Sequence, residues 1–258
     1  MIKYMDKLKK AANTAAVTVL WIAIWEIASL CVGKEVLLPS PILTVTTLFS
    51  LAGEASFWIS TFYSILRIMT GFILGCAVGI VLGIVCFLAK GVNAFVSPIM
   101  TAVRSAPVAS FIVLALVWIG RPTVPTFIAF LMVMPIIWGS VVAGMGSADR
   151  ELCEVADVFG FSRGKRIRLI YLPGAARFFL PSAASSLGLA WKAGITAEVL
   201  ASPKLAIGTS LNEAKIYLET PSLFAWTLTV IVLSLIFEKL VKAASTALMR
   251  RLHLEVVA

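Results

Sequence analysis

The sequence predicts an all-α membrane protein that crosses a lipid bilayer about six times. Charged residues make up 14% of its 258 residues, whereas soluble domains carry about a quarter. The mean hydropathy is +1.00. Continuous apolar runs recur along the chain, and they are long enough for the roughly 20 residues that a spanning helix needs. Because these runs do not alternate with polar residues, they argue against a transmembrane β-barrel.

The apolar runs define the expected elements in order. We expect spans at roughly 14–33, 60–88, 99–119, 124–146, 177–200 and 222–244. They belong to one transmembrane domain covering residues 1–258, with its core at about 57–248. The first run is long and no small-residue cleavage site follows it, so we interpret it as an uncleaved span. The start of the second span, around Phe57–Tyr63, is expected at the membrane interface.

The segment between the first two spans contains Pro39 and Pro41, followed by an amphipathic stretch. This pattern predicts an external loop with a short surface helix. The second span then places glycine at every fourth position: Gly71, Gly75, Gly79 and Gly83. Such a stripe lets another helix approach closely. The fifth span is dense in alanine, serine and glycine and is also expected to pack tightly.

Lysine and arginine predict the orientation, because cytoplasmic segments of membrane proteins are enriched in both. With a cytoplasmic N-terminus, the outer segments hold Lys34, Arg121, Lys204 and Lys215. The inner segments hold about fifteen: Lys3, Lys7, Lys9, Lys10, Lys90, Arg150, Arg163, Lys165, Arg166, Arg168, Arg177, Lys239, Lys242, Arg250 and Arg251. An even number of spans places both termini in the cytoplasm. The net charge of +9 is therefore a topology signal, and nucleic-acid binding is not needed to explain it.

The densest charge lies in a cytoplasmic loop at about 147–175, between the fourth and fifth spans. Glu151, Glu154 and Asp157 share one face of an expected amphipathic helix, and an apolar face holds Leu152, Val155, Ala156 and Phe159. Gly160 is expected to end this helix. Residues 164–171 are expected to form a second short helix with basic side chains outward, which Leu172-Pro173 would end.

This loop resembles the conserved loop of bacterial ABC-importer permeases, which reads E-A-A, three residues, G, nine residues, I-x-L-P. Here it reads Glu154-Val155-Ala156, then Gly160, then Ile170-Tyr171-Leu172-Pro173, with Val155 replacing the first alanine. The stretches at 67–83, 104–120 and 190–201, and Leu-Leu-Pro-Ser-Pro near residue 38, resemble the nitrate/sulfonate/taurine branch. That branch includes importers of thiamine precursors.

The resemblance implies the transmembrane domain of a type I ABC importer with cytoplasmic coupling helices. It implies a permease homodimer in a bacterial inner membrane, a cytosolic ATPase dimer docked on the loop, and an extracytoplasmic substrate-binding protein. The solute would be small and polar or anionic, such as a sulfonate, nitrate, taurine or a thiamine precursor. The residues implied to couple to the ATPase are Glu154, Val155, Ala156, Gly160, Ile170, Leu172 and Pro173. A loop that only sets topology is the alternative.

The chain is expected to be a transport subunit without enzymatic activity. A phosphate-binding loop needs G-x-x-x-x-G-K-[ST], but in Gly160-Phe-Ser-Arg-Gly-Lys-Arg the glycine spacing is one residue short and Arg166 replaces the serine or threonine. ATP and Mg²⁺ would then be bound by the partner ATPase, and this chain would bind no cofactor. Its one histidine is His253, and its four cysteines have no disulfide or zinc spacing.

A stand-alone secondary transporter or channel is the alternative function. Such proteins contain inverted repeats with interrupted spans, and the two halves of this sequence show no matching pair of interrupted segments.

Ionisable residues within the spans need a reason, because each costs about 2.5–3.5 kcal/mol to insert. Glu26, Arg67, Arg104, Lys192 and Glu198 are in this class. We predict that Arg104, Trp191, Lys192 and Glu198 line the substrate pathway. For Arg104 and Arg67 the alternative is an interfacial anchor, and for Glu198 it is an ion pair with a basic residue of a neighbouring helix.

Overall fold

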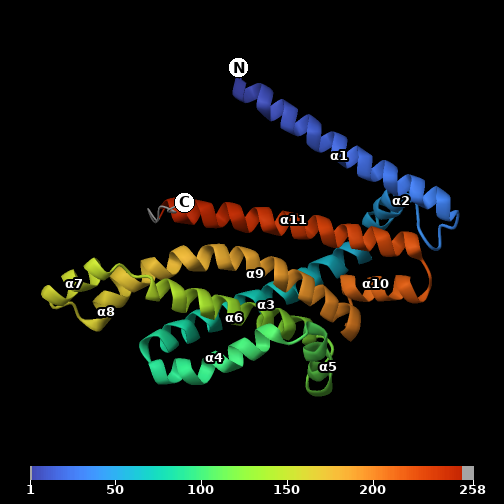
Figure 1. Cartoon of the computed structure of the whole chain (residues 1–258). Helices are drawn as coiled ribbons and strands as arrows, with labels where there is room; N and C mark the ends of the chain where they lie inside the picture. Colours follow the sequence, from blue (N-terminus) through green and yellow to red (C-terminus); the bar gives the residue numbers. More distant parts are fainter. Residues whose placement is uncertain (1, 252–258) are drawn as a thin grey trace. The chain divides into compact units, whose positions relative to one another are not determined.

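The computed structural model describes the backbone of residues 2–251 and the side chains of residues 13, 14 and 16–247. The side chains of Lys3, Lys7, Lys9, Lys10, Arg250 and Arg251, and all of His253, lie outside this description. Within residues 2–251 the ordered elements are all helices (Figure 1). In chain order they are α1 (Ile2–Val32), α2 (Pro41–Ala52), α3 (Ala55–Leu88), α4 (Lys90–Ser105), α5 (Val108–Trp118), α6 (Val124–Gly146), α7 (Arg150–Val158), α8 (Arg163–Arg166), η1 (Ile167–Tyr171), α9 (Leu172–Ala201), α10 (Ile207–Ile216) and α11 (Thr220–Arg251).

Among the described residues, three helices are long and apolar enough to cross a membrane: α3, α6 and residues Thr220–Ala247 of α11. A fourth span arises if α4 and α5 are counted together, although they are bent by 105° at their junction. The predicted count of six spans stays a prediction. The span expected at 99–119 is thus interrupted, and it comprises the second half of α4 and α5. Pro107 disfavours helical geometry at the preceding residue, and Ala106 is accordingly extended, with φ −77° and ψ 144°.

The chain divides into two compact units, and the first comprises residues up to Ile59 together with Ser210–Val230. Here α2 follows the loop as predicted, and the Ser40 hydroxyl caps it by accepting a hydrogen bond from the Leu43 amide at 3.1 Å. The loop is tied to α1, because the Trp25 indole N–H donates to the Pro39 carbonyl at 3.0 Å. The Phe57 ring stacks on Trp226, with 4.7 Å between centroids.

The second unit comprises Ser60–Thr209 and the residues from Ile231 onward. The predicted glycine stripe of α3 lies against α6. A methyl group added at Gly71 would lie 2.3 Å from the Thr126 carbonyl oxygen. The corresponding distances from Gly75, Gly79 and Gly83 to the Cβ atoms of Val133, Ile137 and Val141 are 2.8, 2.9 and 2.7 Å. The close approach predicted for this stripe is therefore confirmed.

The small residues of α9 also serve close packing, as predicted, and α6 and α9 form an extensive helix pair. Near the start of α9, a methyl group added at Gly174 would lie 2.8 Å from the Gly144 carbonyl oxygen of α6. Towards its other end, a methyl group at Gly194 would lie 2.5 Å from the Ile68 side chain of α3. The helix is thus held against α6 and α3. The prediction that residues 1–258 form a single domain stays a prediction.

We predict that Gly75→Val destabilises the protein by about 1–3 kcal/mol, because the new side chain must push α6 away or adopt a strained rotamer. The measurement is the thermal unfolding midpoint in detergent. Gly91→Ala in α4 is the matched control, since a methyl group there meets nothing within 4 Å. An unfolding midpoint for Gly75→Val equal to that of Gly91→Ala would contradict the role assigned to the stripe.

Candidate functional site

The loop between α6 and α9 folds as two short helices around a glycine turn. The Asp149 carboxylate caps α7 by accepting a hydrogen bond from the Glu151 amide at 2.9 Å. The Arg150 Nε lies 3.5 Å from the Glu154 carboxylate one turn later. Asp149 also places a negative charge at the positive end of the helix dipole. The predicted helix over this stretch is therefore confirmed, from Arg150 to Val158.

Gly160 ends α7 as predicted, in the left-handed conformation with φ +61°. The Phe161 amide donates to the Ala156 carbonyl at 2.9 Å, and the Gly160 amide donates to the Asp157 carbonyl at 3.1 Å. These two bonds define a Schellman motif, which satisfies helix carbonyls that would otherwise lack donors. The turn is thus built from backbone hydrogen bonds that require a positive φ at residue 160.

Side chains from α8 lock the turn further. Arg166 forms an ion pair with Asp157 and donates from Nε to the Phe161 carbonyl at 3.2 Å. The Lys165 ammonium lies 3.9 Å from the centroid of the Phe161 ring. The prediction that every basic side chain of this second helix points outward is therefore wrong for Arg166, which is half-buried. Its guanidinium is used to hold α7 and α8 together.

The apolar side chains of α7 are mostly exposed. Val158 is 84% exposed, Phe159 73%, Leu152 53% and Val155 48%. Ala156 is only 1% exposed, so it lies inside the loop and away from the surface. The loop therefore presents a preformed apolar surface, made of these four exposed residues and flanked by the acids Glu151 and Glu154. Exposed apolar patches of this kind mark interaction sites.

Leu172 and Pro173 do not end the second helix, contrary to the prediction. Helical geometry continues from α8 through the π-helical turn η1 into α9, and Pro173 lies in the first turn of α9. The wider π turn, in which the Leu172 amide donates to the Ile167 carbonyl, leaves space for the proline ring. Ile170 and Pro173 are half-buried there, and Leu172 is exposed.

Tyr171 packs this turn against α3. Its ring lies 5.0 Å from that of Phe87, centroid to centroid. Burial raises the pKa of its phenol above the usual value, and the neighbouring Cys153 raises it further. The Tyr171 hydroxyl is therefore neutral at physiological pH.

The four residues predicted to line a substrate pathway fall into two groups. Arg104 and Lys192 are exposed. Trp191 is 1% exposed, and its ring packs edge-on against Phe237 with 5.0 Å between centroids. Glu198 is fully buried. Exposed cations are thus present, whereas the tryptophan and the acid are enclosed by protein.

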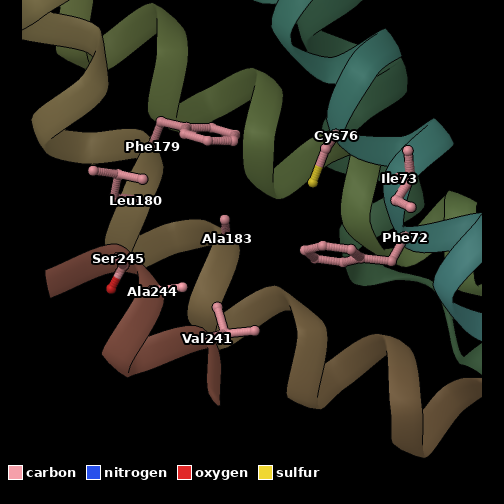
Figure 2. A pocket seen from close by; sticks show the side chains of 9 residues that line it. All are labelled: Phe72, Ile73, Cys76, Phe179, Leu180, Ala183, Val241, Ala244 and Ser245. Atoms are coloured by element: carbon pink, nitrogen blue, oxygen red, sulfur yellow. The ribbon is translucent and has the colours of Figure 1, made fainter. Parts of the chain in front are cut away.

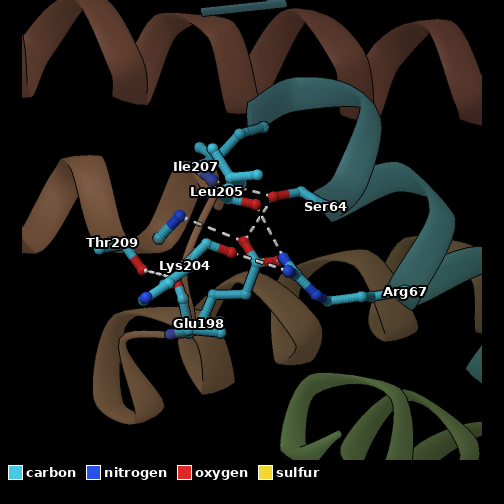
Figure 3. Close-up of polar contacts among 9 residues, drawn as sticks. Ser64, Arg67, Glu198, Lys204, Leu205, Ile207 and Thr209 are labelled. Atoms are coloured by element: carbon cyan, nitrogen blue, oxygen red, sulfur yellow. Dashed lines mark hydrogen bonds and ion pairs between the residues drawn. The ribbon is translucent and has the colours of Figure 1, made fainter. Parts of the chain in front are cut away.

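Glu198 forms the ion pair that the sequence left open as an alternative (Figure 3). Its Oε1 lies 3.4 Å from the Arg67 guanidinium of α3. Its Oε2 accepts hydrogen bonds from the Ser64 hydroxyl at 2.7 Å and from the Gly208 amide at 3.2 Å. The carboxylate is therefore paired and hydrogen-bonded, as a buried charge must be.

The same cluster binds the backbone of the turn between α9 and α10. Arg67 donates to the carbonyls of Lys204 and Leu205, at 2.8 and 2.9 Å. The Ser64 hydroxyl accepts from the Ile207 amide at 2.9 Å. Ser64 and Gly208 were not predicted as site residues. Glu198 as an intramembrane acid was the available signal, but the sequence does not specify its partners.

A cavity of about 280 Å³ lies between α3, α9 and α11 (Figure 2). Its lining is almost entirely hydrocarbon, and the Ser245 hydroxyl that borders it donates to the Lys242 carbonyl. Small-molecule sites need a few convergent polar groups, so this cavity is unsuited to a polar solute. The lining residues are Phe72, Ile73, Cys76, Phe179, Leu180, Ala183, Val241, Ala244 and Ser245.

Comparison with known proteins identifies the class. Residues 71–251 match the family described as "Binding-protein-dependent transport system inner membrane component". The chain belongs to this family of ABC-importer permeases, which work with an ATPase and a binding protein. Its fold is that of the type I ABC importer transmembrane domain. A bacterial ABC transporter involved in the import of alginate superposes with a TM-score of 0.63 at 16% identity, over 96% of this chain and 99% of that chain.

Two curated relatives are similar to this chain over most of its length. The putative aliphatic sulfonates transport permease protein SsuC of Bacillus subtilis is 29% identical over 207 residues, which is 79% of this chain and 74% of the relative. The taurine transport system permease protein TauC of Escherichia coli is 26% identical over 220 residues, 83% of this chain and 80% of the relative. The chain is thus a permease component and not an ATPase.

We predict that Gly160→Val opens the turn roughly tenfold more often, because a left-handed conformation costs an L-residue roughly 1–2 kcal/mol. The measurement is hydrogen exchange of the Phe161 amide, which should quicken by the same factor. Gly160→Asn should change this exchange rate less than Gly160→Val, since asparagine tolerates a left-handed conformation better than valine does. Gly164→Val is the positional control, because a methyl group at Gly164 meets nothing and its φ is ordinary. Equal exchange in the two valine variants would contradict the role of Gly160.

Proposed function

We propose that the chain is the permease subunit of an ATP-driven, binding-protein-dependent importer of a small polar or anionic solute. The observation that carries this proposal is the α7–α8 loop, a locked helical turn with exposed apolar side chains. Family membership supports the transport class. It also disfavours the stand-alone transporter that the sequence left as an alternative.

The loop is proposed to dock on a cytosolic ATPase dimer, which binds ATP and Mg²⁺. Val155, Val158 and Phe159 would enter an apolar groove of the ATPase, and Glu154 would contact its rim. Ala156 and Gly160 would act by shaping the turn, since Ala156 is buried and Gly160 has a positive φ. Ile170, Leu172 and Pro173 lie where the loop joins α9, so they would transmit movement into the membrane.

The proposed orientation places this loop and both termini in the cytoplasm of a bacterium. Arg163, Lys165 and Arg168 of the loop are exposed, as expected for residues that remain on the cytoplasmic side. The turn between α9 and α10 then faces outward, towards an extracytoplasmic binding protein. A homodimer would supply the second half of the pathway.

The proposed solute class follows from two observations. SsuC and TauC are named for aliphatic sulfonates and taurine, which carry a sulfonate group. Arg104 and Lys192 are exposed cations on α4 and α9, and a pathway for anions needs such charges. We propose that both side chains attract the solute, while the buried Trp191 fixes the orientation of α9 beside Lys192.

The loop proposal is tested by purifying the tagged chain from gently solubilised native membranes. Val155→Asp combined with Val158→Asp should reduce the amount of co-purified ATPase at least tenfold, because two charges would be buried in an apolar interface. Glu151→Ala on the same helix is the control and should retain the partner. Retention of the ATPase by the double variant would refute docking through this surface.

The pathway proposal predicts that Lys192→Gln or Arg104→Gln raises the KM for sulfonate uptake roughly tenfold, since a cation that attracts the anion is lost. Uptake of radiolabelled taurine or an alkanesulfonate into cells measures this. Arg121→Gln, an exposed arginine between α5 and α6, is the matched control. Unchanged uptake in both variants would rule out a contribution of these cations.

A further inference from the structure

We infer that Ser64, Arg67 and Glu198 are positioning residues for transport. They fasten the end of α9 to α3 and to the turn at 202–208, so that a movement of the α7–α8 loop reaches this turn. The inference rests on the proposed function, because it requires an ATPase that moves the loop. It gives the buried Glu198 a role outside the substrate pathway.

The first step is the continuity of α9 with the loop. Ile167, the first residue of η1, has helical angles of φ −57° and ψ −49°, and Leu172, which follows η1, has φ −68° and ψ −42°. The chain is therefore helical without interruption from Arg163 to Ala201. The 30 residues of α9 span about 45 Å at 1.5 Å per residue. The loop lies at one end of this helical segment, and Glu198 lies in the last turn at the other.

The second step is the way Glu198 holds its surroundings. Its Oε2 accepts a hydrogen bond from the Gly208 amide. The Ser64 hydroxyl bridges a second amide to the same oxygen, because it accepts from the Ile207 amide and donates to Glu198 Oε2. Both amides belong to the first turn of α10, whose amides have no partner within the helix. A carboxylate at this helix end is also favoured by the helix dipole. Glu198 thus connects the last turn of α9 to the first turn of α10.

The third step is that the turn needs external support. Ser202 and Leu205 have φ values of 46° and 53°. This left-handed conformation costs a residue that carries a side chain roughly 1–2 kcal/mol. Arg67 holds the carbonyls of Lys204 and Leu205 with two nitrogens of one guanidinium. Gly208 is required as well, because a methyl group there would lie 2.3 Å from the Glu198 Cβ. The turn keeps its strained shape because α3 and α9 bind its backbone.

The cluster therefore differs from an ion pair that only fills a core. An isolated buried ion pair can often be replaced by apolar residues without loss of stability. Here the charged groups bind backbone atoms of the turn, so their removal releases the turn as well as unpairing a charge. The side chains of Lys204 and Leu205 are exposed on this turn, and any partner outside would meet them in a fixed position.

The test uses the assembled permease and ATPase in lipid nanodiscs, with native cysteines replaced by serine. One spin label is attached at Arg163→Cys in the loop and another, in a separate preparation, at Lys204→Cys in the turn. In the wild-type background, ATP·Mg²⁺ with vanadate should change the spectrum at both positions. In Glu198→Gln the loop label should respond within twofold of wild type, while the response of the turn label falls at least fivefold.

Arg67→Lys separates charge from geometry, because an ammonium cannot hold two carbonyls in the planar fork of a guanidinium. In Arg67→Lys, the response of the turn label should lie between the responses in wild type and in Glu198→Gln. Glu213→Gln and Arg121→Lys, at exposed positions, are the matched controls and should behave as wild type. If Glu198→Gln fails to assemble, Ser64→Ala removes only the hydroxyl relay and should still reduce the turn response.

A turn label that responds fully in assembled Glu198→Gln, or in Ser64→Ala where that variant replaces it, would overturn the inference while leaving ATPase coupling intact. A loop label that does not respond in the wild-type background would instead contradict the proposed function. The two failures are therefore distinguishable, because the first is a turn label that still responds in the variant and the second is a silent loop label in the wild-type background.

Discussion

Close backbone approach between α3, α6 and α9 is the constraint on which the second unit depends. Within a bilayer, lipid tails are as apolar as leucine, so burial of apolar surface does not drive helices together. Van der Waals contact must do so, and it requires small residues at the crossing points. Gly71 to Gly83 provide them on α3, and Gly144 with Gly174 provides them between α6 and α9. The polar contacts of Glu198 with Ser64 and Arg67 join two of these helices, α9 and α3.

The α7–α8 loop, which follows α6, is shaped in a different way. A loop exposed to water has no lipid or core to shape it, so local hydrogen bonds must do so. Asp149 caps one helix, Gly160 turns the chain, and Arg166 ties the turn to α7. The result leaves Val158 and Phe159 exposed at a defined angle. An apolar surface fixed before binding loses little conformational freedom when a partner covers it.

Few ionisable residues lie within the predicted spans of the second unit. Glu198 and Arg67 are costly to bury. Their contacts with each other and with the backbone of the turn at 202–208 offset that cost. Arg104 and Lys192 remain exposed. This division separates ionisable groups that hold the protein's backbone in place from those that are exposed. Uninterrupted helical geometry from Arg163 to Ala201 joins the α7–α8 loop to the turn that Arg67 and Glu198 hold.

The sequence by itself determined the helical membrane class, the glycine stripe, the α7 helix and the turn at Gly160. These features depend on composition, on a four-residue period, and on local backbone geometry. Tertiary structure decided the rest. The break at Ala106–Pro107 and the continuity through Pro173 depend on whether neighbouring turns can widen or bend around a proline. Two partners of Glu198, Ser64 and Arg67, lie more than 130 positions away in the sequence, and no local pattern specifies such a contact. The sequence marked Glu198 as a buried charge in need of a partner, and only packing chose Arg67, Ser64 and Gly208.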